Sequence, residues 1–234
     1  MKTALIGICI AGVMAFPAIA QEQDKPEESV KPGINEKFLD PKLKVDEWVN
    51  RFEVESREVY NARKAIVKAI GIKPGSKLAD IGAGTGLFLK PFAHEVGKEG
   101  KVYSVDISEA FVKHLKNRVA KEKHENVEVV LCQEDSVSLA ENSVDIAFIC
   151  DTYHHFEYPM KTLASIRKAL VPGGRLVVID FERIPGVSRE WLLTHVRAGK
   201  EVFRKEIEDA GFELVSETKM EVLKENYYLI FKNP

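Results

Sequence analysis

The chain has 234 residues, of which 45% are hydrophobic, and its formal net charge is −2. This length favours one sizeable α/β domain over two domains. No basic stretch stands out, so the composition argues against a nucleic-acid-binding surface, and the mixed charges are those of an ordinary enzyme-sized domain.

The first twenty residues differ from the rest of the chain. Lys2 precedes an almost continuous apolar run over residues 4–16, and small residues lead up to Ala20. The run is shorter than the roughly 20 residues that span a bilayer, which predicts a cleaved secretory signal over residues 1–20, cut between Ala20 and Gln21. The mature protein would be exported to the periplasm without a stable membrane span. An uncleaved N-terminal anchor is the alternative.

A polar segment follows the apolar run. Residues 21–33 are rich in Glu, Gln, Lys and Pro and contain little to bury. They are therefore predicted to form a flexible linker within a polar N-terminal extension over residues 21–44. The folded domain is expected to cover residues 45–234.

From residue 46 onward, apolar residues recur at spacings typical of alternating helices and strands. Helices are predicted over residues 46–54, 56–70, 87–96, 108–121, 160–170 and 200–210. Strands are predicted over residues 77–81, 101–106, 127–132, 144–150 and 175–180, followed by two extended segments over residues 212–222 and 227–232. This pattern indicates an α/β fold with a mainly parallel sheet covered on both faces, ending in a hairpin or paired edge strands.

Acidic residues stand at the carboxyl end of every strand in the alternating part of the chain. They are Asp80, Asp106, Asp135, Asp151 and Asp180. In open parallel sheets, ligands bind beyond these ends, near the point where the strand order reverses. The sequence therefore predicts a ligand site along this edge of the sheet.

The stretch LADIGAGTG ends the first strand with three glycines at every second position. Glycine permits tight turns and lets a ligand touch the main chain. Asp106 follows at the distance of the ribose-binding acid of dinucleotide folds, which predicts an adenosine-type ligand. The spacing is not the dinucleotide pattern G-x-G-x-x-G, and Asp80 beside the loop would repel a phosphate. A ligand that carries an ammonium and a sulfonium fits better, and S-adenosylmethionine carries both.

Residues 48–231 resemble a class I, Rossmann-like S-adenosylmethionine-dependent methyltransferase of the small-molecule type, similar to the quinone-biosynthesis methyltransferases. The resemblance rests on the segments LADIGAGTG, VYSVDIS, CQEDS, SVDIAFICDTYHHF and LVPGGRLVVID. It implies a single seven-stranded Rossmann-like domain, S-adenosyl-L-methionine as the cofactor, and in-line transfer of a methyl group to a small-molecule acceptor. These segments do not identify the acceptor, and the sequence does not define the oligomeric state.

The resemblance also implies roles for individual residues. Asp80 would anchor the amino group of the methionine part, Asp106 would bind the ribose, and Ile107 would pack on the adenine. Asp135 and the Ser136 amide would contact the adenine amino group. The remaining residues implied in cofactor binding are Gly82, Ala83, Gly84 and Gly86 in the loop and Asp151 near the reaction centre.

Three residues after the fourth strand are candidates for catalysis. His155 and His154 are candidate general bases because histidine titrates near neutral pH, and Tyr153 would shape or hydrogen-bond the acceptor. The alternative is that the paired histidines only orient their loop. No metal site is expected, because neighbours in an extended segment point apart.

Two regions are predicted to shape specificity. Residues 48–60 would form a lid, and residues 183–200 lie where relatives insert substrate-binding structure. If His195, Arg197 and Lys200 face the pocket, an acceptor with a carboxylate is favoured. Ordinary packing and solvated charge is the alternative for each of them.

Cys132 and Cys150 are expected to be free, buried thiols. In the strand order of the family, two strands separate theirs, and at about 4.8 Å per strand this exceeds the roughly 7 Å Cα limit for a disulfide.

Two other functions are weighed against methyl transfer. The glycine spacing disfavours a nicotinamide-dependent reductase. A non-catalytic protein that binds S-adenosylmethionine or S-adenosylhomocysteine stays open as an alternative, because an exported chain has no obvious supply of the cofactor.

Overall fold

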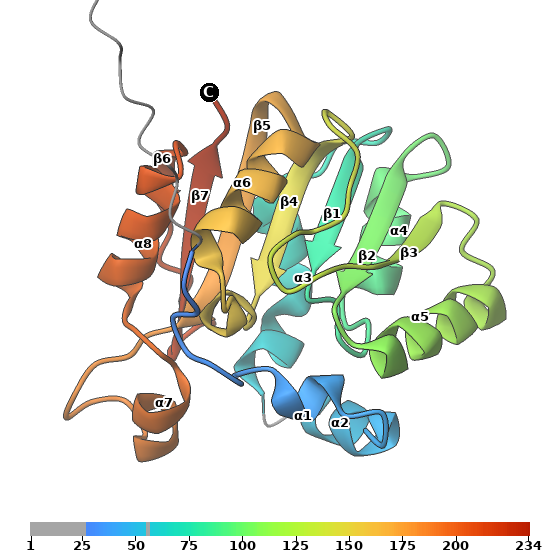
Figure 1. Cartoon of the computed structure of the whole chain (residues 1–234). Helices are drawn as coiled ribbons and strands as arrows, with labels where there is room; N and C mark the ends of the chain where they lie inside the picture. Colours follow the sequence, from blue (N-terminus) through green and yellow to red (C-terminus); the bar gives the residue numbers. More distant parts are fainter. Residues whose placement is uncertain (1–26, 55–56) are drawn as a thin grey trace, which may run out of the picture.

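The computed structural model describes residues 27–54 and 57–234 (Figure 1). The predicted signal over residues 1–20 and the predicted helix start at Ser56 lie outside the described residues. Within the described ranges, no helix is long and apolar enough to cross a membrane.

A seven-stranded sheet with the order β3-β2-β1-β4-β5-β7-β6 forms the centre of the domain. The first five strands of the chain pair in parallel, whereas β7 runs antiparallel to both β5 and β6. The predicted fold class and its antiparallel C-terminal edge are therefore confirmed. The strands are β1 (Lys77–Ile81), β2 (Lys101–Asp106), β3 (Val127–Leu131), β4 (Val144–Cys150), β5 (Leu170–Phe181), β6 (Glu213–Glu217) and β7 (Asn226–Lys232).

Helices cover both faces of the sheet (Figure 1). Side chains from α3, α4 and α5 share one buried apolar cluster with the sheet, and side chains from α6 and α8 share the other. Each fully buried Ile or Leu in these clusters contributes roughly 1.5–3 kcal/mol. The helices are α3 (Glu58–Ile70), α4 (Leu89–Val96), α5 (Glu109–Glu122), α6 (Pro159–Ala169) and α8 (Lys200–Asp209).

Four short elements gather at the carboxyl edge of the parallel strands (Figure 1). They are α1 (Glu36–Leu39), α2 (Val45–Phe52), the 3-10 helix η1 (Tyr153–His155) and α7 (Glu190–His195). β1 lies between β2 and β4, so the strand order reverses here. This is the place where open α/β sheets bind their ligands.

The N-terminal extension is not a flexible linker in the part that the structure describes. We call residues 27–39 the N-terminal strap. The Glu27 carboxylate accepts hydrogen bonds from the backbone N–H groups of Met160 and Lys161 at the start of α6, each at 2.8 Å, and Ile34 is buried. The prediction from composition was wrong here because these polar contacts need few apolar residues.

β5 includes the segment Pro172-Gly173-Gly174 and begins at Leu170, earlier than the predicted strand start at residue 175. The Gly173 N–H donates to the Asn233 carbonyl at 2.7 Å, and the Asn233 N–H donates to the Gly174 carbonyl at 2.8 Å. These bonds satisfy the backbone, so β5 begins directly after α6 ends at Ala169.

Candidate functional site

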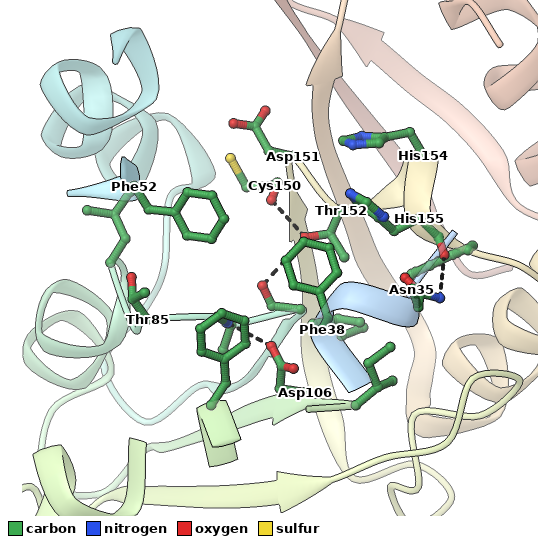
Figure 2. A pocket seen from close by; sticks show the side chains of 18 of the residues that line it. Asn35, Phe38, Phe52, Thr85, Asp106, Cys150, Asp151, Thr152, His154 and His155 are labelled. Carbon is green, nitrogen blue, oxygen red and sulfur yellow. Dashed lines mark hydrogen bonds between the residues drawn. The ribbon is translucent and has the colours of Figure 1, made fainter. Parts of the chain in front are cut away.

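A cavity of about 550 Å³ opens at the carboxyl edge of the sheet, within the size range of small-molecule sites. The ends of β1, β2 and β4 line one side of it, and the N-terminal strap, α2, η1 and α7 are among the other segments that contribute. Figure 2 shows part of this lining. The structure brings together ten of the predicted site residues here: Asp80, Gly82, Ala83, Gly84, Asp106, Ile107, Ser136, Asp151, His154 and His155.

The glycine loop after β1 fits closely against its neighbours. The N–H groups of Gly82 and Ala83 donate to the Val105 carbonyl at 2.8 and 3.0 Å. Gly82 has a φ of 72°, and a Cβ at this position would lie 2.2 Å from Cγ2 of Thr152. Only glycine therefore fits here, and the loop presents bare backbone to the cavity.

Two residues predicted to bind the cofactor lie outside the cavity lining. A Cβ at Gly86 would lie 2.8 Å from Cδ2 of Leu115, so this glycine lets α5 pack close to the loop. The Asp135 carboxylate is partly exposed and pairs with Lys161 at 3.5 Å, whereas its neighbour Ser136 lines the cavity. The structure thus places Ser136 in the cavity lining and the Asp135 side chain outside it.

Two buried carboxylates flank the glycine loop. Asp80 is 3% exposed and Asp106 is 6% exposed. Asp106 accepts hydrogen bonds from the N–H groups of Gly84 and Ser108, each at 2.8 Å (Figure 2). Burial and then repulsion from Asp106 raise the pKa of Asp80 to about 7. Burial raises the pKa of Asp106 to about 6, although the backbone hydrogen bonds lower it.

Asp151 follows β4 in a conformation that is rare for a residue with a side chain. Its φ is 49°, and such strained backbone clusters at functional sites. Its carboxylate accepts hydrogen bonds from the Arg57 guanidinium and the Asn226 amide. Burial raises the pKa of Asp151 to about 6, although the positive charge of Arg57 lowers it. No local sequence pattern predicts this pairing, because its members come from three distant segments.

Three histidines lie together at one end of the cavity. His154 and His155 are adjacent in η1, with ring centroids 4.3 Å apart (Figure 2), and His195 comes from α7. Nδ1 of His154 lies 2.8 Å from Oδ1 of Asp180, and its Nε2 lies 3.2 Å from Nε2 of His195. The expectation that the paired histidines point apart was wrong, because they lie in a 3-10 turn and not in an extended segment.

Burial and then repulsion from His154 lower the pKa of His155 to about 2, and the same two causes lower the pKa of His195 to about 4. Both rings are therefore neutral at pH 7. A group with so low a pKa is a weak proton acceptor, which argues against His155 as the general base.

The Tyr153 side chain points into the core and does not line the cavity. Its side chain is fully buried, packs beside Phe156 and Phe203 with centroids 5.0 Å away, and donates a hydrogen bond to Glu206 at 3.0 Å. The 3-10 turn directs it away from its two histidine neighbours. Tyr153 therefore cannot contact an acceptor in this conformation.

Aromatic side chains cover the cavity from the N-terminal side. The Phe38 ring lies 4.9 Å from Trp48 and 6.2 Å from Phe111, and Trp48 lies 5.2 Å from Phe52. The predicted lid over residues 48–60 thus contributes Trp48 and Phe52 to the lining. Phe38 was missed because it falls in the segment assigned to the polar extension.

The basic residues after β5 do not form an anion site. Arg197 donates to both carboxylate oxygens of Glu206, at 2.8 and 2.7 Å. Lys200 pairs with Glu182 at 3.2 Å and with Glu217 at 2.6 Å. Neither residue lines the cavity, and His195, which does line it, is neutral at pH 7 because burial lowers its pKa to about 4, so the three residues do not favour a carboxylate-bearing acceptor.

Cys132 and Cys150 are free, as predicted, but they are not fully buried. Both are partly exposed and line the cavity. β2 and β1 separate the strands that precede them, which rules out a disulfide between the two. Burial raises the pKa of Cys132 to about 12 and the pKa of Cys150 well above its usual value of 9.

These pKa values predict slow alkylation. At pH 8, iodoacetamide should modify Cys132 and Cys150 at least about 100-fold more slowly than a small unhindered thiol, because the thiolate is the reacting form. Peptide mass spectrometry after timed labelling measures each site separately. Rapid labelling of either thiol in the folded protein would contradict the raised pKa.

A family model described as a methyltransferase domain matches residues 79–178. The chain is similar to the ubiquinone/menaquinone biosynthesis C-methyltransferase UbiE of Hydrogenovibrio crunogenus, with 30% identity over 123 residues, 52% of this chain and 48% of the relative. UbiE of Burkholderia mallei is 29% identical over 133 residues, 56% of this chain and 54% of the relative. The chain thus matches about half the length of these curated relatives.

Solved structures extend the likeness over most of the domain. An S-adenosylmethionine-dependent methyltransferase from Aquifex aeolicus matches with a TM-score of 0.72 and 26% identity, over 82% of this chain and 99% of that chain. Phosphoethanolamine N-methyltransferase 2 of Haemonchus contortus, solved with S-adenosyl-L-methionine, shows the same fold with a TM-score of 0.65 and 24% identity, over 80% of this chain and 46% of that chain. The matched family domain includes the glycine loop and the acids of β1, β2 and β4. The chain therefore carries a methyltransferase domain over residues 79–178 and resembles the class I, Rossmann-like S-adenosylmethionine-dependent methyltransferases in fold.

Proposed function

We propose that this chain transfers a methyl group from S-adenosylmethionine to a small-molecule acceptor. The observation that carries the proposal is Asp80, a buried carboxylate without a cationic partner among the described residues. A buried unpaired charge is costly. A ligand ammonium at this position would offset that cost, whereas a phosphate would be repelled by both Asp80 and Asp106.

The cavity residues fit this cofactor. Asp106 presents a carboxylate for the ribose hydroxyls, and it is held in place by the Gly84 and Ser108 N–H groups. Gly82 and Gly84 leave the loop free of side chains, and Ile107 lines the cavity beside Asp106. When bound, the cofactor supplies an electrophilic methyl group on a sulfonium.

The chain itself would position the acceptor, exclude water and accept a proton. Phe38, Trp48 and Phe52 close one side of the cavity. Holding two reactants in a fixed orientation lowers the free-energy barrier of a transfer by several kcal/mol. His154 is the better-placed base of the two predicted, because Asp180 holds its ring at 2.8 Å.

The acceptor that suits these walls is aromatic. Phe38, Phe181 and Trp191 line the cavity beside the three histidines, and planar rings pack well on such side chains. The UbiE relatives carry names that place them in quinone biosynthesis, which supports a phenol- or quinol-type acceptor for this chain.

Calorimetry followed by a transfer assay tests the proposal. The purified chain is titrated with S-adenosylmethionine, S-adenosylhomocysteine and NAD⁺, and then incubated with methyl-labelled cofactor and a panel of phenols, quinols, thiols, amines and carboxylates. We expect both adenosyl ligands to bind, NAD⁺ not to bind, and label to appear on a phenol or quinol. Binding of NAD⁺ alone would overturn the cofactor assignment, and binding without transfer across the panel would favour the non-catalytic alternative.

The affinity for S-adenosylmethionine is expected to fall as the pH is lowered from 7.5 to 5.5. Asp80 has a pKa of about 7 in the ligand-free protein, so at lower pH it is neutral and must lose its proton to pair with the ligand ammonium. Below pH 7 the dissociation constant should rise by up to about tenfold per pH unit. Calorimetry across this range measures the slope, and Asp80→Asn should make it shallower. A parent affinity that does not change with pH would contradict this role of Asp80.

We also propose that the chain is exported, with cleavage after Ala20. The support is the pattern of the first residues, where a charge, an apolar run and small residues follow in order. Mass spectrometry of the protein recovered from the periplasmic fraction of an expressing bacterium tests this. A mature N-terminus at Gln21 is expected, and an intact precursor confined to the cytoplasm would contradict it.

A further inference from the structure

The ring nitrogens of the three cavity histidines lie close together. One nitrogen from each of His154, His155 and His195 lies within 4.8 Å of the others. All three residues also line the cavity. They come from two elements, η1 and α7, so the fold brings together side chains that are 41 positions apart in the sequence.

One pair of these nitrogens has the spacing of zinc ligands. In a tetrahedral zinc site with Zn–N distances of about 2.0–2.1 Å, two ligand nitrogens are about 3.3 Å apart. Nε2 of His154 and Nε2 of His195 are 3.2 Å apart and meet head to head. Nδ1 of His155 is buried and has no hydrogen-bond partner among the described residues, which leaves a lone pair available to a ligand.

The surroundings of His154 resemble the outer layer of a metal site. Its Nδ1 is hydrogen-bonded to the Asp180 carboxylate. This carboxylate also accepts hydrogen bonds from the backbone N–H groups of His154 and Phe181, at 3.0 and 2.7 Å. A carboxylate held in this way fixes the ring and directs its Nε2 outward, as in carboxylate–histidine–zinc arrangements. Trp191 stacks on His195 with centroids 4.8 Å apart and shields the other side.

The charges around the cluster act in both directions. Asp180 and Asp151 lie close to His154 and would favour a cation, whereas Lys31 and Lys37 lie close to His155 and His195 and would oppose one. Asp180 contacts the His154 ring directly at 2.8 Å, whereas Lys31 bonds to the backbone carbonyl of His195 and not to a ring, so the balance at the ring nitrogens favours a cation.

We propose that His154, His155 and His195 form a binding site for a divalent transition metal, with Zn²⁺ as the ion that fits best. Three imidazoles suit zinc, copper, nickel or iron, and zinc readily accepts tetrahedral geometry with one position left open. Because the three rings line the cavity, the open position faces the space for the acceptor. This part rests on the proposed function: with the ion bound, His154 is a ligand and no longer a base, so an acceptor oxygen would bind at the open position as its anion after releasing its proton to water.

Zinc retention tests the site directly. The full chain without a polyhistidine tag is stripped with a chelator, loaded with ZnCl₂, dialysed against metal-free buffer and measured by elemental analysis. We expect one zinc per chain, with a dissociation constant below about 10 μM. Loading with Co²⁺ in place of zinc should give the visible absorption of a four- or five-coordinate ion.

Single-histidine variants locate the ion. His195→Ala lies on a partly exposed helix, so folding is expected to survive, and removal of this ligand should weaken zinc binding by at least about 100-fold. His155→Ala should have the same effect, and His94→Ala, which removes an exposed histidine elsewhere, should leave retention unchanged. Failure to retain zinc, or retention that both cavity variants leave unaltered, overturns the site. A chain that retains zinc but ignores S-adenosylmethionine contradicts only the proposed function.

Discussion

Asp80→Asn should weaken the binding of S-adenosylmethionine by about 10- to 100-fold, because one charge-assisted hydrogen bond is worth roughly 1.5–3 kcal/mol. The carboxamide keeps the size of the side chain but cannot neutralise the ligand ammonium. Calorimetry at pH 8, where the parent carboxylate is ionised, measures the loss. The reaction chemistry need not be known for this test.

The same substitution should stabilise the ligand-free protein at pH 8. The folded-state pKa of Asp80, about 7, lies above the ordinary value of 3.8. The folded state therefore holds a proton that the unfolded state releases between pH 4 and 7, and the free energy of unfolding falls as the pH rises through this window. A shift of this size corresponds to as much as about 4 kcal/mol. Urea unfolding should show Asp80→Asn to be the more stable protein at pH 8 and little different at pH 4.

Asp145→Asn is the matched control. Asp145 lies on the neighbouring strand β4 at the opposite end of the sheet, where its carboxylate accepts the Lys77 N–H at 2.8 Å. It does not line the cavity. Its replacement should leave the affinity for S-adenosylmethionine within about twofold. If Asp80→Asn binds as tightly as Asp145→Asn, Asp80 does not recognise the ligand ammonium.

Gly82→Ala should abolish measurable cofactor binding and destabilise the fold. The added Cβ would lie 2.2, 2.5 and 2.9 Å from Cγ2, Oγ1 and Cβ of Thr152, so rotation of the threonine side chain cannot clear the overlap. The loop must shift, and overpacking of this kind costs about 1–3 kcal/mol. The displaced loop would also move the Gly84 N–H away from Asp106. Thermal unfolding and calorimetry measure the two effects.

Gly97→Ala separates this contact from backbone strain. Gly97 has a φ of 69°, close to the 72° of Gly82, but a Cβ there would meet nothing within 4 Å. Both variants incur the cost of a positive φ, on the order of 1–3 kcal/mol, and only Gly82→Ala adds the overlap. Gly97→Ala should therefore bind S-adenosylmethionine normally. Equal binding by the two variants would show that the close approach at Gly82 is not required.

The sheet could be predicted from the sequence because each strand carries its own signal. β1, β2 and β4 have the predicted bounds, since each is a short apolar run that ends in a turn or an acid. The glycine loop and the acids beside it follow from their place at strand ends. For the same reason, Asp80, Asp106 and Asp151 lie together in the cavity as parallel strand ends must.

The remaining parts of the site depend on contacts between distant segments. The residue types of Tyr153, His154 and His155 do not distinguish a 3-10 turn from an extended segment. The 3-10 turn nevertheless decides which of the three side chains enters the core. The meeting of His154 with His195 depends on the placement of α7 across 41 residues. No periodicity reports such a juxtaposition.

The N-terminal strap has a consequence for the rate of each catalytic cycle. Two hydrogen bonds and one ring contact join the strap to the elements that bear the histidines: Asn35 donates to the His155 carbonyl at 3.1 Å, Lys31 donates to the His195 carbonyl at 3.0 Å, and the Phe38 ring lies 5.1 Å from the His155 ring. Contacts of this kind open far more often than a packed core. Release of S-adenosylhomocysteine when the N-terminal strap opens, and not the methyl transfer itself, would then limit turnover.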